Sequence, residues 1–249
     1  MIYDVDSDGF LINPTSMDNV SEHWKSVIDE VITLSSSVHG DNLHSLYIRG
    51  SVPEGTAHDY SDLDMICVLS ERKETNLTDD HKKSILDMNL KKVDYSLIAL
   101  DDFTEETEFL LKVQSLYLFG KDLIPDIKEF SIFDVPKSDL DQIADGFYDL
   151  CSYGISDPNA TDDEKKAVCR WLSRQVLMSA YNIVISREGV YTRDLTSCYL
   201  GYSKYYHLDI VKEFFDYYNN PITDLELLSD KWVEIEEILE GQFKDRTLD

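Results

Sequence analysis

The chain has 249 residues, and its 49 acidic and 23 basic residues give a formal net charge of −26 at pH 7. Apolar residues make up 43% of the sequence, which is enough to fill the core of one large domain or two smaller ones and excludes a disordered chain. The negative charge repels polyanions, so it disfavours nucleic acid or an anionic membrane as a partner. It favours a cationic partner, although an acidic surface also suits solubility or a salty habitat.

The four cysteines are far apart, lie in apolar or aromatic runs and include no CxxC pair; they are Cys67, Cys151, Cys169 and Cys198. This spacing predicts reduced, buried thiols. The first ten residues, MIYDVDSDGF, lack the basic start and apolar stretch of a signal peptide, and no apolar run has the length of a membrane span. We therefore expect a cytoplasmic protein with no membrane segment.

The stretch DVDSDG, residues 4–9, is similar to the start of a calcium-binding EF-hand loop. The twelfth position counted from Asp4 is Thr15, where that loop needs a bidentate Glu. The stretch therefore predicts a turn before a short strand at residues 10–12 rather than a calcium site.

The first half of the chain alternates between helical and strand patterns. Ser16 is placed to cap a helix over residues 18–36, whose apolar residues recur at helical spacing. Short apolar runs predict strands near residues 44–50, 62–70 and 91–100, with a helix near residues 81–88. The order predicts a small mixed sheet with helices packed against it.

A further helical pattern covers residues 104–119, and the Gly and Pro of FGKDLIPDI then mark a boundary. Beyond it the patterns are helical, over residues 138–153, 162–187, 195–205, 208–218 and 224–240. We expect an α+β chain with a mixed-sheet domain at residues 1–130 and an all-α helical bundle at residues 131–249.

The stretch GSVPEGTAHDYSDLD, residues 50–64, contains two carboxylates separated by one residue. On a strand, Asp62 and Asp64 leave the same face with Cα atoms about 6–7 Å apart. They repel each other unless a cation lies between them, and Mg²⁺ prefers such hard oxygen ligands. Gly50 and Ser51 follow a predicted strand, where backbone N–H groups and a hydroxyl are placed to meet a phosphate. The parts suit phosphoryl chemistry.

A third carboxylate is expected on a neighbouring strand. Asp94 lies inside the apolar run VDYSLIAL, where an unpaired acid would be costly. It is the natural candidate.

With these residues, the stretch 46–100 resembles the polymerase-beta-type nucleotidyltransferase domain, whose pattern is a glycine-serine pair, a later glycine and S-D-[IL]-D before apolar residues. The resemblance implies that Asp62 and Asp64 bind two Mg²⁺ ions that hold a nucleoside triphosphate, ATP or another. Asp94 is then a third metal ligand or the general base, and Gly50 and Ser51 contact the phosphates. For Arg49, contact with the phosphates and pairing with a structural acid remain equal alternatives.

A nucleotidyltransferase-like domain followed by a helical bundle resembles the aminoglycoside adenylyltransferases. In those enzymes the third acid is a glutamate that acts as base. The resemblance places Arg193 where a basic residue reaches the triphosphate. Thr192 is suited to cap the next helix, whose N-terminal N–H groups favour anions. The alternative is a surface pair of Arg193 with Asp194 or Glu188.

The resemblance implies Mg²⁺-dependent transfer of a nucleoside monophosphate, AMP from ATP, to a hydroxyl of a small cationic acceptor such as an aminoglycoside, and hence antibiotic resistance. One alternative keeps this chemistry but uses a protein or tRNA acceptor, as in nucleotidyltransferase toxins; the missing basic face argues against tRNA. Another is a nucleotide-binding module without catalysis.

Overall fold

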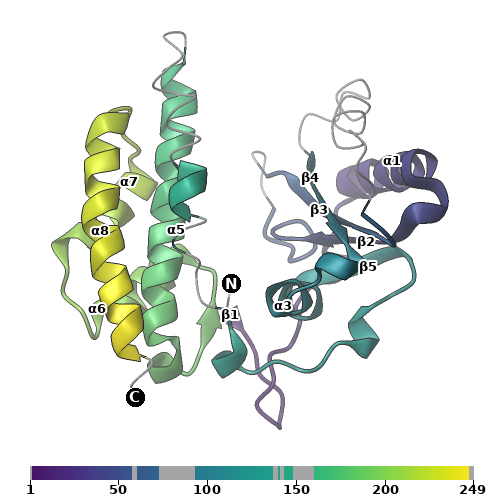
Figure 1. The fold of residues 1–249 in the computed structure, drawn as a ribbon, viewed down its shortest axis with the longest axis horizontal. Coiled ribbons are helices and arrows are strands. Elements are labelled where there is room, and N and C mark those ends of the chain that lie inside the picture. The colour runs from purple at the N-terminus through teal and green to yellow at the C-terminus, as the bar shows by residue number, and fades with distance from the viewer. Residues whose placement is uncertain are drawn as a thin grey trace. The chain divides into compact units, whose positions relative to one another are not determined.

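The computed structural model describes residues 2–57, 61–72, 93–136, 140, 143–147 and 160–246. The chain forms two compact units, Val5–Ser131 and a second made of Met1–Asp4 with Ile132–Asp249. The sequence predicts a boundary at residue 130, but it does not predict that the first residues belong with the second unit. Both units are shown in Figure 1.

The first unit is built on a four-stranded mixed sheet of β2 (Leu43–Arg49), β3 (Leu63–Leu69), β4 (Val93–Ala99) and β5 (Ser115–Gly120). The strand order is β4-β3-β2-β5. The β3–β4 pair is parallel, whereas β2 pairs antiparallel with both β3 and β5. The mixed sheet predicted from the sequence is confirmed.

Each face of this sheet packs against a helix, α1 (Glu22–His39) on one side and α3 (Glu105–Gln114) on the other (Figure 1). Alternate residues of β3 divide between the two cores. Leu63, Met65, Cys67 and Leu69 pack with α1, and Ile66 and Val68 pack with Leu111 of α3. The continuous apolar run of β3 therefore results from burial on both faces.

Two helices differ from their predicted bounds. Ser16 caps the short 3-10 helix Met17–Asn19, and α1 begins only at Glu22. The helix predicted over residues 104–119 ends at Gln114, because Asn13 Nδ2 donates to the backbone oxygens of Lys112 at 3.0 Å and Ser115 at 2.8 Å. The chain then continues as β5, whose pairing with β2 replaces the helical hydrogen bonds.

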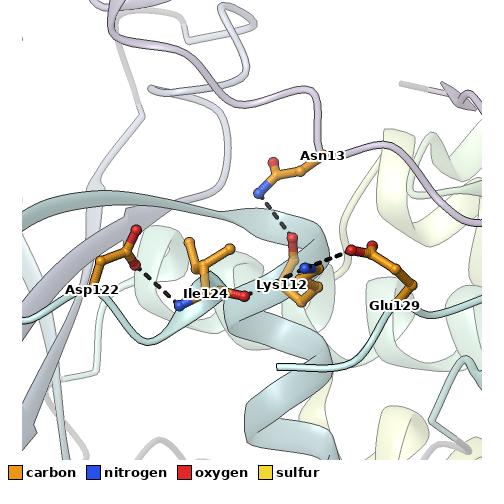
Figure 2. Close-up of polar contacts among 5 residues, drawn as sticks. All are labelled: Asn13, Lys112, Asp122, Ile124 and Glu129. Atoms are coloured by element: carbon orange, nitrogen blue, oxygen red, sulfur yellow. Dashed lines mark hydrogen bonds and ion pairs between the residues drawn. The ribbon is translucent and has the colours of Figure 1, made fainter. Parts of the chain in front are cut away.

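The segment after β5 is fastened to α3 through Lys112, whose side chain is only 14% exposed. Figure 2 shows its Nζ directed at Glu129 Oε1, 2.8 Å away, and at the Ile124 backbone oxygen, 3.3 Å away. Asp122 Oδ1 accepts a hydrogen bond from Ile124 N at 3.0 Å in the same view. The Phe130 oxygen then accepts from Leu11 N at 2.7 Å.

The stretch similar to an EF-hand loop is a turn, as predicted. Asp6 Oδ1 accepts hydrogen bonds from the backbone nitrogens of Asp8 and Phe10, both at 2.9 Å. Gly9 completes the turn with a φ of 89°. The predicted strand at residues 10–12 reduces to two isolated bridges, Val5 with Leu11 and Phe10 with Ser131.

The second unit is helical, as predicted. Its helices are α5 (Asp162–Glu188), α6 (Leu195–Ser203), α7 (Asp209–Asn219) and α8 (Leu225–Arg246). It also contains a two-stranded sheet that the sequence does not predict, in which β1 (Ile2–Tyr3) pairs antiparallel with β6 (Tyr191–Thr192). The helix predicted over 81–88 lies outside the described residues, as does most of the one over 138–153.

Short 3-10 turns connect several elements of the described chain, at Met17–Asn19, Gly40–Asn42, Leu100–Asp102, Ile124–Asp126 and Ile132–Asp134. Cys67, Cys169 and Cys198 are buried free thiols, as predicted, and Cys151 lies outside the described residues. In the part of the chain that the structure describes, no helix combines the length and apolar character needed to cross a membrane.

Candidate functional site

The sheet brings two of the predicted acids together. Asp64 is the second residue of β3 and Asp94 the second residue of β4, and the parallel register places them directly opposite each other. Both alternate with residues of the α1 core, so both lie on the sheet face that α3 covers farther along the strands. Asp94, the candidate for the third acid, thus lies on the strand next to Asp64, and its role in the site stays a prediction.

Asp62 lies immediately before β3 rather than within it, since the strand begins at Leu63. Strand alternation therefore does not set the face to which its side chain points. Asp62 and Asp94 are exposed, and the Asp64 side chain is 25% exposed. The three acids thus mark the edge of the sheet where β3 and β4 begin.

Arg49 is the last residue of β2 and pairs with Asp64 in the antiparallel register. Its Nη2 lies 3.9 Å from Asp64 Oδ1, and the two side chains are 27% and 25% exposed. The sequence leaves Arg49 between phosphate contact and pairing with a structural acid. The structure gives it an acidic partner that is itself a candidate metal ligand.

Gly50 follows at this edge with a φ of 78°, in the left-handed region that glycine adopts without strain. A Cβ at this position would lie 2.3 Å from Asp64 Oδ2 and 3.4 Å from Asp64 Cγ. Only a residue without a side chain leaves room for the Asp64 carboxylate here. The predicted glycine therefore has a steric reason that the sequence does not reveal.

The Gly50–Ser51 turn is closed by its own backbone, with Glu54 N donating to Gly50 O at 3.3 Å and Thr56 N to Ser51 O at 2.9 Å. Ser51 Oγ lies 3.2 Å from the Oγ of Ser61, the buried residue before Asp62. The hydroxyl that the sequence assigns to a phosphate thus also joins the two halves of the motif.

Asn19 supports the turn that follows Gly50, although no sequence motif marks it. Its Nδ2 donates to Pro53 O at 2.9 Å, and its Cβ would lie 3.2 Å from a Cβ placed at Gly55. Gly55 has a φ of 73°. Asn19 therefore holds the far side of the turn, and no local pattern signals this, because the contact spans more than thirty residues.

The described residues contain no group of three or more His, Cys, Asp and Glu side chains arranged to hold a metal ion. The donor set fits Mg²⁺, because carboxylate oxygens are the ligands it prefers. Gly50 has no side chain, so the Asp64 carboxylate has room at this edge of the sheet.

In the second unit, Arg193 lies between β6 and α6 and is half-buried. The prediction that Thr192 caps the next helix is wrong. Asp194 is the N-cap, because its Oδ1 accepts from Ser197 N at 2.8 Å, and Thr192 Oγ1 instead accepts from Asp194 N at 3.1 Å. The hydrogen bonds from the backbone and side chain of Ser197 lower the pKa of Asp194.

The two acids considered as alternative partners of Arg193 have other contacts. Asp194 caps α6, and Glu188 Oε2 lies 2.5 Å from Lys204 Nζ. The Glu188 side chain is 13% exposed. The role of Arg193 remains a prediction.

Comparisons with known proteins found likeness in structure only. No family model matches the chain, and no curated protein matches it in sequence. The solved structures similar to it include spectinomycin adenyltransferase AAD(9) from Enterococcus faecialis, crystallised with ATP and spectinomycin. That match has 14% identity and a TM-score of 0.51, and it covers 87% of this chain and 99% of that one.

A second similar structure is the toxin–antitoxin pair MntA-HpeT, in a mutant form. It has 14% identity and a TM-score of 0.32, and it covers 52% of this chain and 93% of that one. Identities this low show the fold alone. The chain thus has an α+β nucleotidyltransferase fold, with a small mixed sheet and a helical unit, similar to that of this spectinomycin adenyltransferase.

Proposed function

We propose that the protein is a nucleotidyltransferase that transfers AMP from ATP to a hydroxyl of a small cationic acceptor, an aminoglycoside being the first candidate. The observation that carries this proposal is the pairing of Asp64 with Asp94 at the edge of the sheet where the Gly50–Ser51 turn lies. The fold shared with a spectinomycin adenyltransferase supports it.

In this proposal Asp62 and Asp64 hold Mg²⁺, and Asp94 is either a third metal ligand or the general base. Bound metal would neutralise charge on the triphosphate and polarise the phosphorus that is attacked. The backbone N–H groups and hydroxyl of Gly50 and Ser51 bind phosphate oxygens.

Asp94 is exposed and opposite Asp64, which suits it to take the proton from the acceptor hydroxyl. The acceptor oxygen then bonds to the α-phosphorus as the bond to pyrophosphate breaks. We further propose that Arg193 contacts the triphosphate.

The charge of the chain supports a cationic acceptor. A net charge of −26 attracts polycations and raises their local concentration at the protein surface. The same field disfavours tRNA, whose affinity depends on neutralising phosphates. On this basis we propose an antibiotic-modifying role in the cytoplasm.

The test is pyrophosphate release from ATP and Mg²⁺ with a panel of aminoglycosides. We expect release with at least one acceptor, and loss of it in Asp62→Asn and Asp64→Asn. Asp41→Asn is the matched control, since Asp41 is exposed and precedes β2 at the opposite end of that strand from Arg49. ATP binding without pyrophosphate release for any acceptor would refute this function.

A further inference from the structure

The ion pair between Arg49 and Asp64 occupies the carboxylate that the proposed function assigns to a metal ion. The two residues are directly opposite in the β2–β3 register, and Arg49 Nη2 lies 3.9 Å from Asp64 Oδ1. Both side chains are about three-quarters covered, with 27% and 25% exposed. The pair is therefore held by the sheet as well as by charge.

The backbone around Asp64 limits where its carboxylate can go. Leu63 and Met65 on either side are fully buried, at 0% and 1% exposure, which fixes the strand. The carboxylate extends over Gly50, in the space that a Cβ would fill. Because an aspartate side chain is short, the Asp64 carboxylate can adopt only a few positions. In the one that it adopts here, it lies beside the Arg49 guanidinium.

The negative charge at this edge of the sheet gives a reason for the presence of the Arg49 guanidinium. Asp94 lies opposite Asp64 on β4, and Asp62 is two residues away. Three carboxylates at one edge repel one another, and the guanidinium charge of Arg49 offsets part of that repulsion. Arg is suited to the task because its charge persists at every physiological pH.

We propose that Arg49 is a resident counter-ion that competes with a divalent cation for Asp64. The proposal rests on the proposed function, since it takes Asp64 as a metal ligand. A cation that binds alone must displace Arg49 from Asp64 and also approach its positive charge. A cation that arrives with a nucleoside triphosphate brings negative charge that offsets this repulsion. Arg49 thereby favours entry of the metal together with the nucleotide over entry of the metal first.

The experiment measures Mn²⁺ affinity of the full chain without nucleotide, in the native protein, Arg49→Gln and Arg49→Lys. Removing the competing charge is expected to tighten Mn²⁺ binding by about two- to fivefold, the factor that corresponds to a partly exposed ion pair. Arg49→Lys keeps the charge and stays near the native affinity.

Arg72→Gln is the matched control, because Arg72 Nε also lies near a carboxylate, 3.6 Å from Asp102 Oδ2, but 80% of its side chain is exposed. It should leave Mn²⁺ affinity unchanged. Melting temperature provides a second readout. Arg49→Gln should melt lower than the native protein in EDTA and gain more from added Mn²⁺.

Equal or weaker Mn²⁺ binding by Arg49→Gln would overturn the proposal, as would the absence of binding in both proteins. The outcome is separate from that of the pyrophosphate assay. Tighter Mn²⁺ binding with no pyrophosphate release would support the counter-ion and refute the transferase. Pyrophosphate release by the native protein, with the same Mn²⁺ affinity in Arg49→Gln, would support the transferase and refute the counter-ion.

Discussion

Gly50→Ala is the sharpest test of how the turn and the acidic edge are coupled. Gly50 has a φ of 78°, and the added Cβ would lie 2.3 Å from Asp64 Oδ2. Two effects follow, backbone strain and displacement of the Asp64 carboxylate. Gly9→Ala separates them, because Gly9 is in the same unit, has a φ of 89° and has no atom within 4 Å of its Cβ position.

The magnitudes can be worked from these contacts. An alanine in the left-handed region costs about 1–2 kcal/mol, and this cost applies to both variants. In Gly50→Ala the Asp64 carboxylate must also move, and even complete loss of its partly exposed ion pair with Arg49 adds at most about 1 kcal/mol. The fold therefore survives both changes, but Asp64 is misplaced in only one of them.

The assays are urea denaturation followed by circular dichroism and the affinity for ATP with Mg²⁺. We expect Gly9→Ala to bind ATP as the native protein does. Gly50→Ala should bind at least about tenfold more weakly, since a displaced ligand costs well over 1 kcal/mol. Equal ATP affinities in the two alanine variants would refute the steric role assigned to Gly50.

Three further changes test other parts of the molecule. Asp94→Asn should lower the transfer rate by about 10²–10⁴-fold and retain ATP affinity if the residue is the base, whereas lost affinity would identify a metal ligand. Lys112→Met should cost about 2 kcal/mol of unfolding free energy, whereas the control Lys25→Met should cost under about 0.5 kcal/mol. Each Nζ lies 2.8 Å from a carboxylate, but only the Lys112 side chain is largely buried. Equal losses in the two variants would contradict this reasoning. Asp194→Ala should cost about 1 kcal/mol at neutral pH by removing the α6 cap. The hydrogen bonds from Ser197 lower the pKa of Asp194 in the folded protein, so its contribution is lost as pH falls through that lowered pKa, and thermal melts of native and variant protein should converge there; a constant difference would contradict the cap.

The sheet and the long helices could be predicted because each has a local signal. The run DLDMICVLS is apolar on both strand faces, and α5 to α8 keep helical periodicity over their length. Residues 115–119 have no local signal that separates a helix from a strand. SLYLF suits a helix or a strand, and the open edge of β2 decides in favour of a strand.

The candidate site divides in the same way. The spacing of Asp62, Asp64 and Asp94 along the chain identifies the acids, but their register across strands depends on pairing over distances that no local pattern encodes. The sequence offers an acidic partner for Arg49 as one of two alternatives, but for this reason it does not identify that partner as Asp64. The sequence predicts the wrong cap for α6 because Thr and Asp are both good N-caps, and only the structure shows that Thr192 belongs to β6.

The pairing of β1 with β6 has a consequence for dividing this protein into parts. Tyr3 and Tyr191 are 3% and 5% exposed, and their ring centroids lie 4.6 Å apart. A gene split after Ser131 would give a C-terminal fragment that lacks β1, leaving Tyr191 uncovered and β6 with an unpaired edge. Linking residues 2–4 to the end of that fragment through a flexible spacer would restore its missing strand. The second unit is thus discontinuous in sequence, because its strand β1 is separated from its helices by the whole of Val5–Ser131.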